Sequence, residues 1–376
     1  MALNFVVTDK TDQYLLKFTL ENTTSSFANA LRRTIIGEVE TAAFDTENYE
    51  TSSLKVIENT SSLHNEFLLH RLGMIPIKVI NTKRFDPSKY KFILNVQNTT
   101  SKIIEVTTAD FEVFDIETGK SVETLDFFPP NRLTGENILI TRLKPNPNGE
   151  GEKIHIEGTC VINSGNYNAR FSPVSATMYV NKTDPEKVEA ALQKYLSSAD
   201  GSVPVEQLKK RFMINESERY FITDENDEPN VFDFTIESVE ILSGANILYL
   251  ACEKLLDKLS KVKEDFERHL LGEDSSINVS KSVTVMDAND ITLHNQSHTL
   301  GYLLQDYLLK FIPQSDLLFA GYNNPHPLEK KIVIRVALSN NNVDNLKEKI
   351  FTTIDIISKD LTMIRSKLIG EFGEDF

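Results

Sequence analysis

The chain has 376 residues, 40% of them hydrophobic, and its 55 acidic and 40 basic side chains give a formal net charge of −15 at pH 7. This length predicts two to three domains, and the hydrophobic content is enough for a sizeable core without any membrane-length apolar run. So large a negative charge repels a polyanion unless basic groups gather on one face. The basic clusters are short, as at Arg32-Arg33 and Lys209-Lys210-Arg211, so direct sequence-specific DNA binding is not expected.

The two cysteines and the N-terminal segment indicate an intracellular setting. Cys160 and Cys252 are too few for a four-cysteine zinc site or a disulfide framework, so we expect two buried free thiols. The opening segment MALNFVVTDKTDQ lacks the basic start and long apolar stretch of a secretory signal. Residence inside the cell, without a membrane anchor, is therefore the expectation.

The first predicted elements are a β-hairpin and a helix. Residues 3–20 form two alternating apolar runs around the polar segment 9–12, a pattern typical of a hairpin. Thr24 or Ser25 can cap the following helix, and Gly37 suits its C-terminal end. The helix has one apolar face, made of Phe27, Ala30, Leu31, Thr34 and Ile35.

A change of pattern follows at about residue 81. From there to residue 163, short β-branched runs alternate with turn signals, which predicts a β-rich domain inserted within the first module. The first module then comprises residues 1–80 plus 164–271. Its later predicted elements are strand 176–180, helix 184–195, strand 232–239 and helix 244–269.

The polar segment 272–281 is predicted to be a linker, and residues 282–376 to form a second module. Its predicted order is ββαββα, with a fold class of α+β for the whole chain. Two very apolar helices on one side of a four-stranded sheet leave an outer flank that the first module is expected to cover. The predicted elements are strands 282–286 and 290–294, helix 299–311, strands 316–322 and 331–339, and helix 343–368.

An internal repeat relates the two modules. Residues 19–35, TLENTTSSFANALRRTI, and residues 292–308, TLHNQSHTLGYLLQDYL, align without a gap, and their apolar positions coincide. Two unrelated helices behind strands are the alternative explanation, but the repeat favours an intramolecular pseudo-dimer. Each buried large apolar side chain contributes roughly 1.5–3 kcal/mol, so such an interface would be permanent. Its predicted residues are Phe27, Ala30, Leu31 and Ile35, against Leu300, Leu303, Leu304 and Leu308.

Catalytic and ligand-binding motifs are missing from the sequence. It contains no phosphate-binding loop, dinucleotide fingerprint, zinc-protease motif or hydrolase nucleophile elbow. The acidic segment 224–228 has Pro229 where a calcium loop needs glycine, so we interpret it as a solvated turn. No catalytic residue, cofactor or metal site is predicted, although an unrecognised enzyme site in the inserted domain is kept as an alternative.

Several segments resemble a known family. Residues 27–45, FANALRRTIIGEVETAAFD, resemble the signature of the α-like subunits of DNA-dependent RNA polymerases. NEFLLHRLGMIPI, residues 65–77, resembles the companion signature of the third-subunit type. SHTLGYLLQDYLL with FAGYNNPHP, at 297–309 and 319–327, resembles the eleventh-subunit type. Further third-subunit resemblance lies at residues 137–143 and 167–179.

This order of segments resembles a fusion of the third and eleventh subunits in one polypeptide. Such fusions are a feature of large cytoplasmic DNA viruses, so the resemblance implies a viral transcription enzyme, present in the host cytoplasm and the virion. One departure concerns the zinc loop that cellular third subunits often carry in the inserted domain. Residues 81–163 contain a single cysteine, Cys160, so the zinc site is not expected here.

The role implied by the resemblance is architectural and non-catalytic. The α-like pair is the platform on which the second-largest and then the largest polymerase subunit assemble, helped by a small zinc-binding subunit. Arg32 and Arg33 would engage the second-largest subunit, because they point away from the apolar face. A free-standing oligomeric scaffold is the alternative, whereas the fused subunit needs no homodimer. The residues expected to face a small subunit are His70, Arg71, Gly73 and Pro76.

Overall fold

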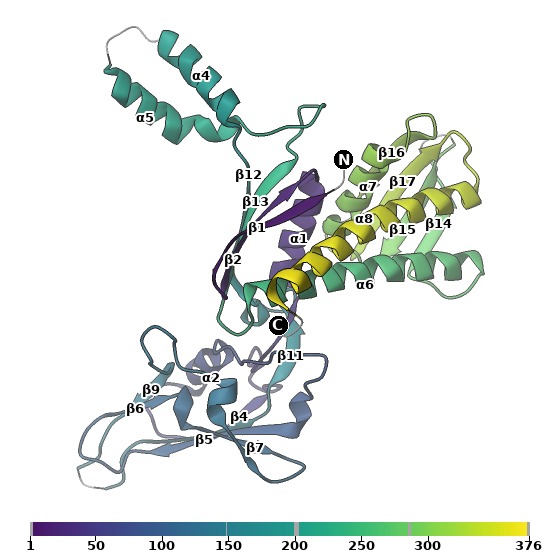
Figure 1. The fold of residues 1–376 in the computed structure, drawn as a ribbon. Helices are drawn as coiled ribbons and strands as arrows, with labels where there is room; N and C mark the ends of the chain where they lie inside the picture. Colours follow the sequence, from purple (N-terminus) through teal and green to yellow (C-terminus); the bar gives the residue numbers. More distant parts are fainter. Residues whose placement is uncertain (1–2, 148, 199–202, 285–286, 374–376) are drawn as a thin grey trace. The chain divides into compact units, whose positions relative to one another are not determined.

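The computed structural model describes residues 3–147, 149–198, 203–284 and 287–373, and the chain divides into two compact units (Figure 1). The fold is α+β, as predicted, with several antiparallel sheets. Unit 1 comprises Met1–Ile35, Ala176–Glu237 and Gly244–Asp375, and unit 2 comprises Ile36–Ser175 and Ser238–Ser243.

Unit 1 begins with the predicted hairpin, which is part of a four-stranded sheet. Its strands are hydrogen-bonded in the order β1 (Asn4–Asp12), β2 (Leu15–Glu21), β13 (Val231–Ser238) and β12 (Val174–Asn181). Aromatic rings gather on one face of this sheet, where Phe18 stacks on Phe234 with 4.8 Å between ring centroids. The apolar residues whose alternation predicted the hairpin therefore lie on the face of the sheet that packs into the core.

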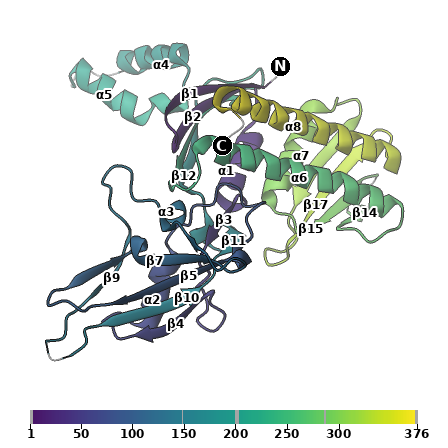
Figure 2. The same ribbon diagram turned by 60° about the horizontal axis from the view of Figure 1, so that its bottom comes forward.

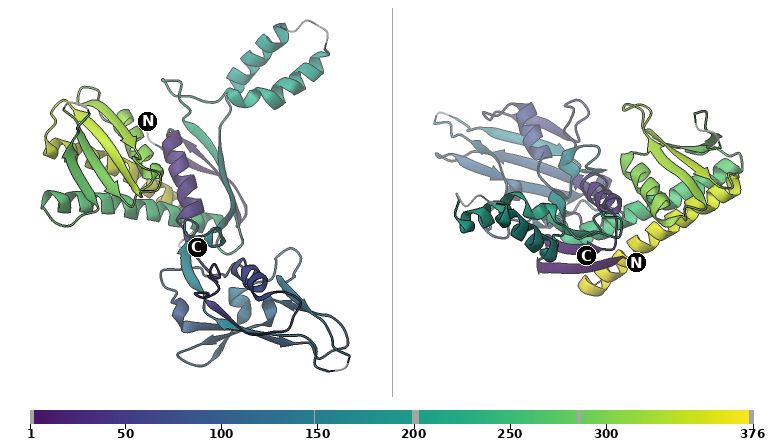
Figure 3. Two further views of the ribbon diagram at one scale, coloured as in Figure 1. Left: turned by 180° about the vertical axis from the view of Figure 1, so that it is seen from behind. Right: turned by 90° about the horizontal axis from the view of Figure 1, so that it is seen from above.

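Helix α1 (Ser25–Gly37) follows β2 directly. Of the two predicted caps, Thr24 is the one that acts, because its Oγ1 accepts a hydrogen bond of 3.2 Å from the backbone N–H of Phe27. The helices α4 (Pro185–Ser197) and α5 (Val205–Asn215) pair through Tyr195 and Phe212, whose centroids are 5.4 Å apart. Figure 3 shows this pair standing apart from both sheets of unit 1.

The second module has the predicted ββαββα order. Its strands are hydrogen-bonded in the order β14 (Ile277–Lys281), β15 (Asn289–His294), β17 (Lys331–Leu338) and β16 (Leu317–Asn323). Its helices are α7 (His298–Phe311) and α8 (Val343–Phe372). Gly301 brings α7 close to the sheet, because a Cβ there would lie 2.8 Å from the ring of Tyr322.

The first strand of this module lies earlier than predicted. It occupies Ile277–Lys281 rather than 282–286, and the last two residues of the predicted strand lie outside the described part of the chain. The predicted linker 272–281 therefore contains β14. The physical reason is that β14 is an edge strand in which Ile277 is buried while Asn278 and Ser280 are exposed, so its sequence is as polar as a linker.

Unit 2 is built mainly from strands. A five-stranded sheet has the order β4 (Leu54–Asn59), β10 (Lys153–Gly158), β5 (Tyr90–Gln97), β7 (Phe111–Asp115) and β8 (Ser121–Val122). Two-stranded sheets pair β3 (Glu40–Ala43) with β11 (Val161–Ser164) and β6 (Ile104–Thr107) with β9 (Leu139–Leu143). The helices of this unit are α2 (Asn65–Gly73) and the short α3 (Thr124–Phe127).

Residues on both sides of position 81 share one core in unit 2. The strands β4, β10 and β5, which contribute to it, lie together in Figure 2. Phe44 packs edge-on against Phe92 with 5.3 Å between centroids, and Leu68 and Leu72 of α2 belong to the same buried cluster. Strand β4 pairs with β10, although almost a hundred residues separate them in the sequence. A local pattern does not show such distant pairing, so the sequence did not indicate that residues before position 81 share a core with residues after it.

Helix α6 (Gly244–Leu270) has the predicted position and apolar face. Short 3-10 helices occupy Pro87–Lys89, Thr108–Asp110, Ala169–Phe171 and Ser217–Arg219. Across the described residues, none of the helices combines the length and the apolar content that crossing a bilayer requires.

Candidate functional site

The helices of the internal repeat contact each other within unit 1. The hydroxyl of Ser26 in α1 donates a hydrogen bond to the carboxylate of Asp306 in α7. One residue further on, the rings of Phe27 and Tyr307 lie 6.2 Å apart, centroid to centroid. The two modules therefore meet through α1 and α7, which are the two segments that the repeat singled out.

All eight residues predicted for this interface are buried, with at most 3% of any residue exposed. Burial is necessary for an interface residue but is also satisfied by the core of each module, so the mutual packing of the eight stays a prediction. The predicted set is Phe27, Ala30, Leu31, Ile35, Leu300, Leu303, Leu304 and Leu308.

Tyr307 connects three helices and was not predicted. Its ring contacts Phe27 of α1, and its hydroxyl lies 3.3 Å from the carboxylate of Asp360 in α8. Burial raises the pKa of Asp360 and that of Tyr307, so the phenol keeps its proton at neutral pH. Tyr307 lies within the repeated segment, but the comparison of the two repeats predicted only its aliphatic neighbours as interface residues.

The long helices α6 and α8 make a second contact between the modules, and they lie side by side in Figures 1 and 2. The guanidinium of Arg365 lies 4.4 Å from the ring centroid of Tyr249, and the rings of Phe266 and Phe351 are 6.0 Å apart. An ion pair of 2.9 Å joins Lys347 to Glu267. The sequence predicted that the second module would be covered by the first, but not that α6 would cover it.

The acidic turn at 224–228 takes part in the contact between modules and is not merely solvated. The carboxylate of Asp224 lies 3.0 Å from Nζ of Lys310 in α7 and accepts the N–H of Asn226. Burial alone would raise the pKa of Asp224, but these hydrogen bonds outweigh it and the pKa is lowered. The turn therefore presents an ionised carboxylate to the second module.

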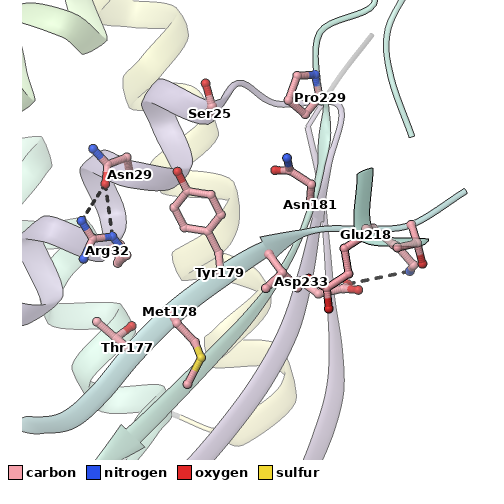
Figure 4. A pocket seen from close by; sticks show the side chains of 13 residues that line it. Ser25, Asn29, Arg32, Thr177, Met178, Tyr179, Asn181, Glu218, Pro229 and Asp233 are labelled. Carbon is pink, nitrogen blue, oxygen red and sulfur yellow. Dashed lines mark hydrogen bonds and ion pairs between the residues drawn. The ribbon is translucent and has the colours of Figure 1, made fainter. Parts of the chain in front are cut away.

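Arg32 and Arg33 occupy different environments on α1. Arg32 is half-buried, and its Nε and Nη2 donate to Oδ1 of Asn29 at 3.1 and 2.9 Å. Arg33 is exposed. Figure 4 shows Arg32 at the edge of a groove between α1 and β12. Both guanidinium groups belong to unit 1, on a helix that also contacts α7.

The residues predicted to face a small subunit lie on or just after α2 in unit 2. His70 and Arg71 are exposed, Gly73 is buried and Pro76 is half-buried. The guanidinium of Arg71 is used inside the unit, because it donates to the carbonyl groups of Ile140 and Leu139 in β9 at 2.8 and 2.9 Å. This tether fixes the direction of α2 relative to the sheets of unit 2.

Gly73 leaves space for a buried arginine that the sequence did not single out. A Cβ at position 73 would lie 2.5 Å from Nη1 of Arg170 and 2.2 Å from Oγ1 of Thr46. The side chain of Arg170 is only 4% exposed, and it donates to the carbonyl of Phe44, to Thr46 and to Glu47. The residues that Arg170 joins are more than a hundred positions away, so no local pattern predicts them.

Burial favours the protonated form of both cysteines at neutral pH. Both are free and buried, as predicted, and burial raises the pKa of Cys160 and of Cys252 to about 12. In the parts of the chain that the structure describes, no three metal-ligating side chains lie close together.

The burial of the two cysteines can be tested by their reactivity, separately in each unit. Because a protonated, buried thiol does not react, we expect a thiol-specific reagent at pH 8 to modify neither cysteine in the native chain and both in denaturant. Cys160 lies in unit 2 and Cys252 in unit 1, so each reports on one unit. Rapid modification in the native chain, located by mass spectrometry, would contradict the burial of that cysteine.

Comparison with known proteins places these features in a family. Residues 17–259 and residues 288–367 each match the model of the RNA polymerase Rpb3/Rpb11 dimerisation domain. The chain is 25% identical to DNA-directed RNA polymerase subunit Rpo3 of Pyrococcus furiosus over 67% of this chain and 93% of that protein. It is 45% identical to a probable RNA polymerase II subunit RPB11 of Caenorhabditis briggsae over 20% of this chain and 59% of that protein.

A third relative, a conjugation stage-specific protein of Tetrahymena thermophila, is 29% identical over 46% of this chain and 58% of its own length. These matches confirm an Rpb3-like N-terminal region and an Rpb11-like C-terminal domain. The chain belongs to the RNA polymerase Rpb3/Rpb11 dimerisation-domain family, as a non-catalytic, Rpb3-like assembly subunit of DNA-directed RNA polymerase.

Proposed function

We propose that this chain is a third and an eleventh polymerase subunit fused in one polypeptide, and that the paired modules form the platform on which the second-largest and then the largest subunit assemble. The observation that supports this most strongly is that α1 contacts α7 and α6 contacts α8 inside one chain. Because the two dimerisation domains pair with each other inside one chain, the chain does not need to form a homodimer. Fusion also gives the pairing a high effective concentration.

The proposal extends to the division of labour within the chain. Residues 1–80 plus 164–271 are the third-subunit-like module, residues 282–376 are the eleventh-subunit-like module, and residues 81–163 form the insert. His70, Arg71, Gly73 and Pro76 would present the end of α2 to a small zinc-binding subunit. We further propose a source among the large cytoplasmic DNA viruses, with the protein in the host cytoplasm and the virion, because the fusion is a feature of that group.

The test is purification of the tagged chain from its native setting, followed by mass spectrometry and a measurement of solution mass. Two very large polymerase subunits at one copy each are the expected companions. Recovery of the chain alone or as a homo-oligomer would instead favour a free-standing scaffold with the same fold. A retained metal or small molecule, without polymerase subunits, would point to an enzyme site.

Charge reversal on α1 should abolish assembly without unfolding the chain. Arg33 is exposed and Arg32 is half-buried, so Arg32→Glu with Arg33→Glu changes the local charge by −4 at little structural cost. We expect loss of copurification of the second-largest subunit, with an unchanged melting temperature. The matched control is Lys209→Glu with Lys210→Glu, the same charge change on the exposed side of α5. Normal assembly of the α1 double variant would refute the role of these arginines.

A further inference from the structure

The first strand of the chain lies at the edge of its sheet. Among the described residues, β1 ends the strand order, next to β2. The backbone N–H and C=O groups on the outer side of an edge strand can pair with a strand of another chain. Residues 3–8, LNFVVT, contain no charged side chain, no proline and no glycine, and Val6 is 42% exposed. Short segments of this composition pair readily with copies of themselves when their edge is open.

The second half of β1 is irregular, and this irregularity protects it from such pairing. Its register with β2 shifts between Val7 and Asp9, and again between Asp9 and Asp12. Register shifts of this kind bend an edge strand away from the straight ladder that a new strand would need. In the first half, residues 4–7 pair in regular register with residues 18–21 of β2. The first half of β1 is therefore a regular edge, open to pairing unless another element covers it.

The C-terminal end of α8 lies beside β1 and contacts this regular half (Figures 2 and 3). Nζ of Lys367 donates hydrogen bonds to the carbonyl of Phe5 at 2.9 Å and to Oδ1 of Asn4 at 3.0 Å. The amide of Asn4 is oriented by β2, because its Nδ2 donates to the carboxylate of Glu21 at 2.9 Å. A backbone acceptor in the regular half of β1 is therefore occupied by a side chain of the second module.

The last turn of α8 makes a second contact, with the other half of β1. Nζ of Lys10 lies 2.7 Å from the carboxylate of Glu371 and 6.0 Å from the ring centroid of Phe372. Lys367 and Glu371 are four residues apart, so they share one face of the helix. Leu368, between them in the sequence, is fully buried and fixes the position of the helix end. The end of α8 is thus held where it contacts both halves of the strand.

We propose that the end of α8 covers the edge of β1 and so prevents it from pairing with the β1 strand of a second copy of this chain. A lysine at an edge, and a helix laid over it, are two general ways in which proteins block such pairing. A second copy is the partner that the strand itself selects, because it brings the same uncharged segment, residues 3–8. The inference concerns self-association and does not rest on the polymerase role proposed above.

The covering contacts affect association far more than folding. The side chains of Lys10 and Glu371 are 55% and 47% exposed, and an ion pair so exposed adds little to stability. The apolar residues that anchor the end of α8, such as Leu368, do not take part in these contacts with β1. Changing the charged residues should therefore open the edge while the chain stays folded.

Exchanging the two charges on α8 tests the proposal without changing the net charge. In Lys367→Glu with Glu371→Lys, a carboxylate faces the carbonyl of Phe5, and a second lysine faces Lys10. We expect the solution mass of this double variant to double as its concentration rises, with a melting temperature close to that of the wild-type chain. The matched control exchanges an exposed ion pair of unit 2, in Lys89→Glu with Glu117→Lys, and should stay monomeric.

A third substitution shows whether β1 is the surface that associates. Val6→Lys places a lysine on the exposed side of the edge strand, so it should return the double variant to a monomer. Solution mass is measured by light scattering on the full chain over a wide range of concentration. Amide exchange is followed by mass spectrometry in peptides covering β1, where we expect it to slow about tenfold in the dimer.

Three results would overturn the proposal. They are a double variant that stays monomeric, a dimer that persists when Val6→Lys is added, and a wild-type chain that is already a dimer with slow exchange in β1. If the double variant does not melt cooperatively, Lys367→Ala with Glu371→Ala takes its place, because it removes the same contacts without adding repulsion. The same results then support or overturn the covering role of α8.

Discussion

Leu304→Asp should separate the two modules. Leu304 is 1% exposed in α7, the helix that contacts α1, so the substitution places a carboxylate in an apolar interface. Burying an ionised group without a partner costs several kcal/mol, in addition to the roughly 1.5–3 kcal/mol of apolar burial that is lost. We expect a markedly lower melting temperature for unit 1 and rapid cleavage by protease between the modules.

The reactivities of Cys252 and Cys160 show which of the two units opens in this variant. Cys252 lies on α6 near Arg365 of α8, so opening of the module interface should make it reactive, while Cys160 in unit 2 stays protected. Leu309→Asp is the matched control, because Leu309 is on the same helix but half-exposed. Unchanged melting, protease resistance and Cys252 reactivity in Leu304→Asp would contradict its place in the interface.

Arg170→Ala should destabilise unit 2 by about 3 kcal/mol, because it removes a nearly buried guanidinium and leaves its acceptors without a donor. The affected groups are the carbonyl of Phe44, the hydroxyl of Thr46 and the carboxylate of Glu47, which lies 2.9 Å from Nη2. Unfolding should be followed in urea through the reactivity of Cys160, which belongs to the same unit. Cys252 should be unaffected.

Arg142→Ala is the control for this variant. Arg142 also pairs with a glutamate in unit 2, Glu105 at 2.8 Å, but both side chains are more than half exposed. Exposed ion pairs contribute at most about 1 kcal/mol, so this variant should be nearly neutral. Equal stability losses in the two variants would show that Arg170 has no special structural role.

These two results would describe a subunit with two kinds of structural support. In unit 1, apolar helices and a few bridging polar groups such as Tyr307 and Lys310 hold the modules together. In unit 2, the guanidinium of Arg170 joins a loop to the segment around Asn168, beside the end of α2. A scaffold needs fixed surfaces rather than titrating groups, and both arrangements limit movement near the residues proposed to contact other subunits.

Local pattern predicted most of the helices and strands of unit 1, which includes the second module. The hairpin, α1, α6, α7 and α8 all lie close to their predicted positions, since each has a long, strongly periodic apolar face. Strand β14 was missed because an edge strand is polar on one side. The sequence did not indicate that β4 packs with the insert, because β4 and β10 pair across most of the intervening chain.

The sequence by itself determined the α+β class, the two related modules and the family, because these depend on apolar periodicity and on motifs that are contiguous in the chain. Only the tertiary structure decided which groups meet: Ser26 with Asp306, Asp224 with Lys310, and Arg170 with Thr46. Each of these contacts joins residues at least 86 positions apart. Periodicity reports which face of an element is buried, whereas the partner across that face is chosen by the packing of the whole chain.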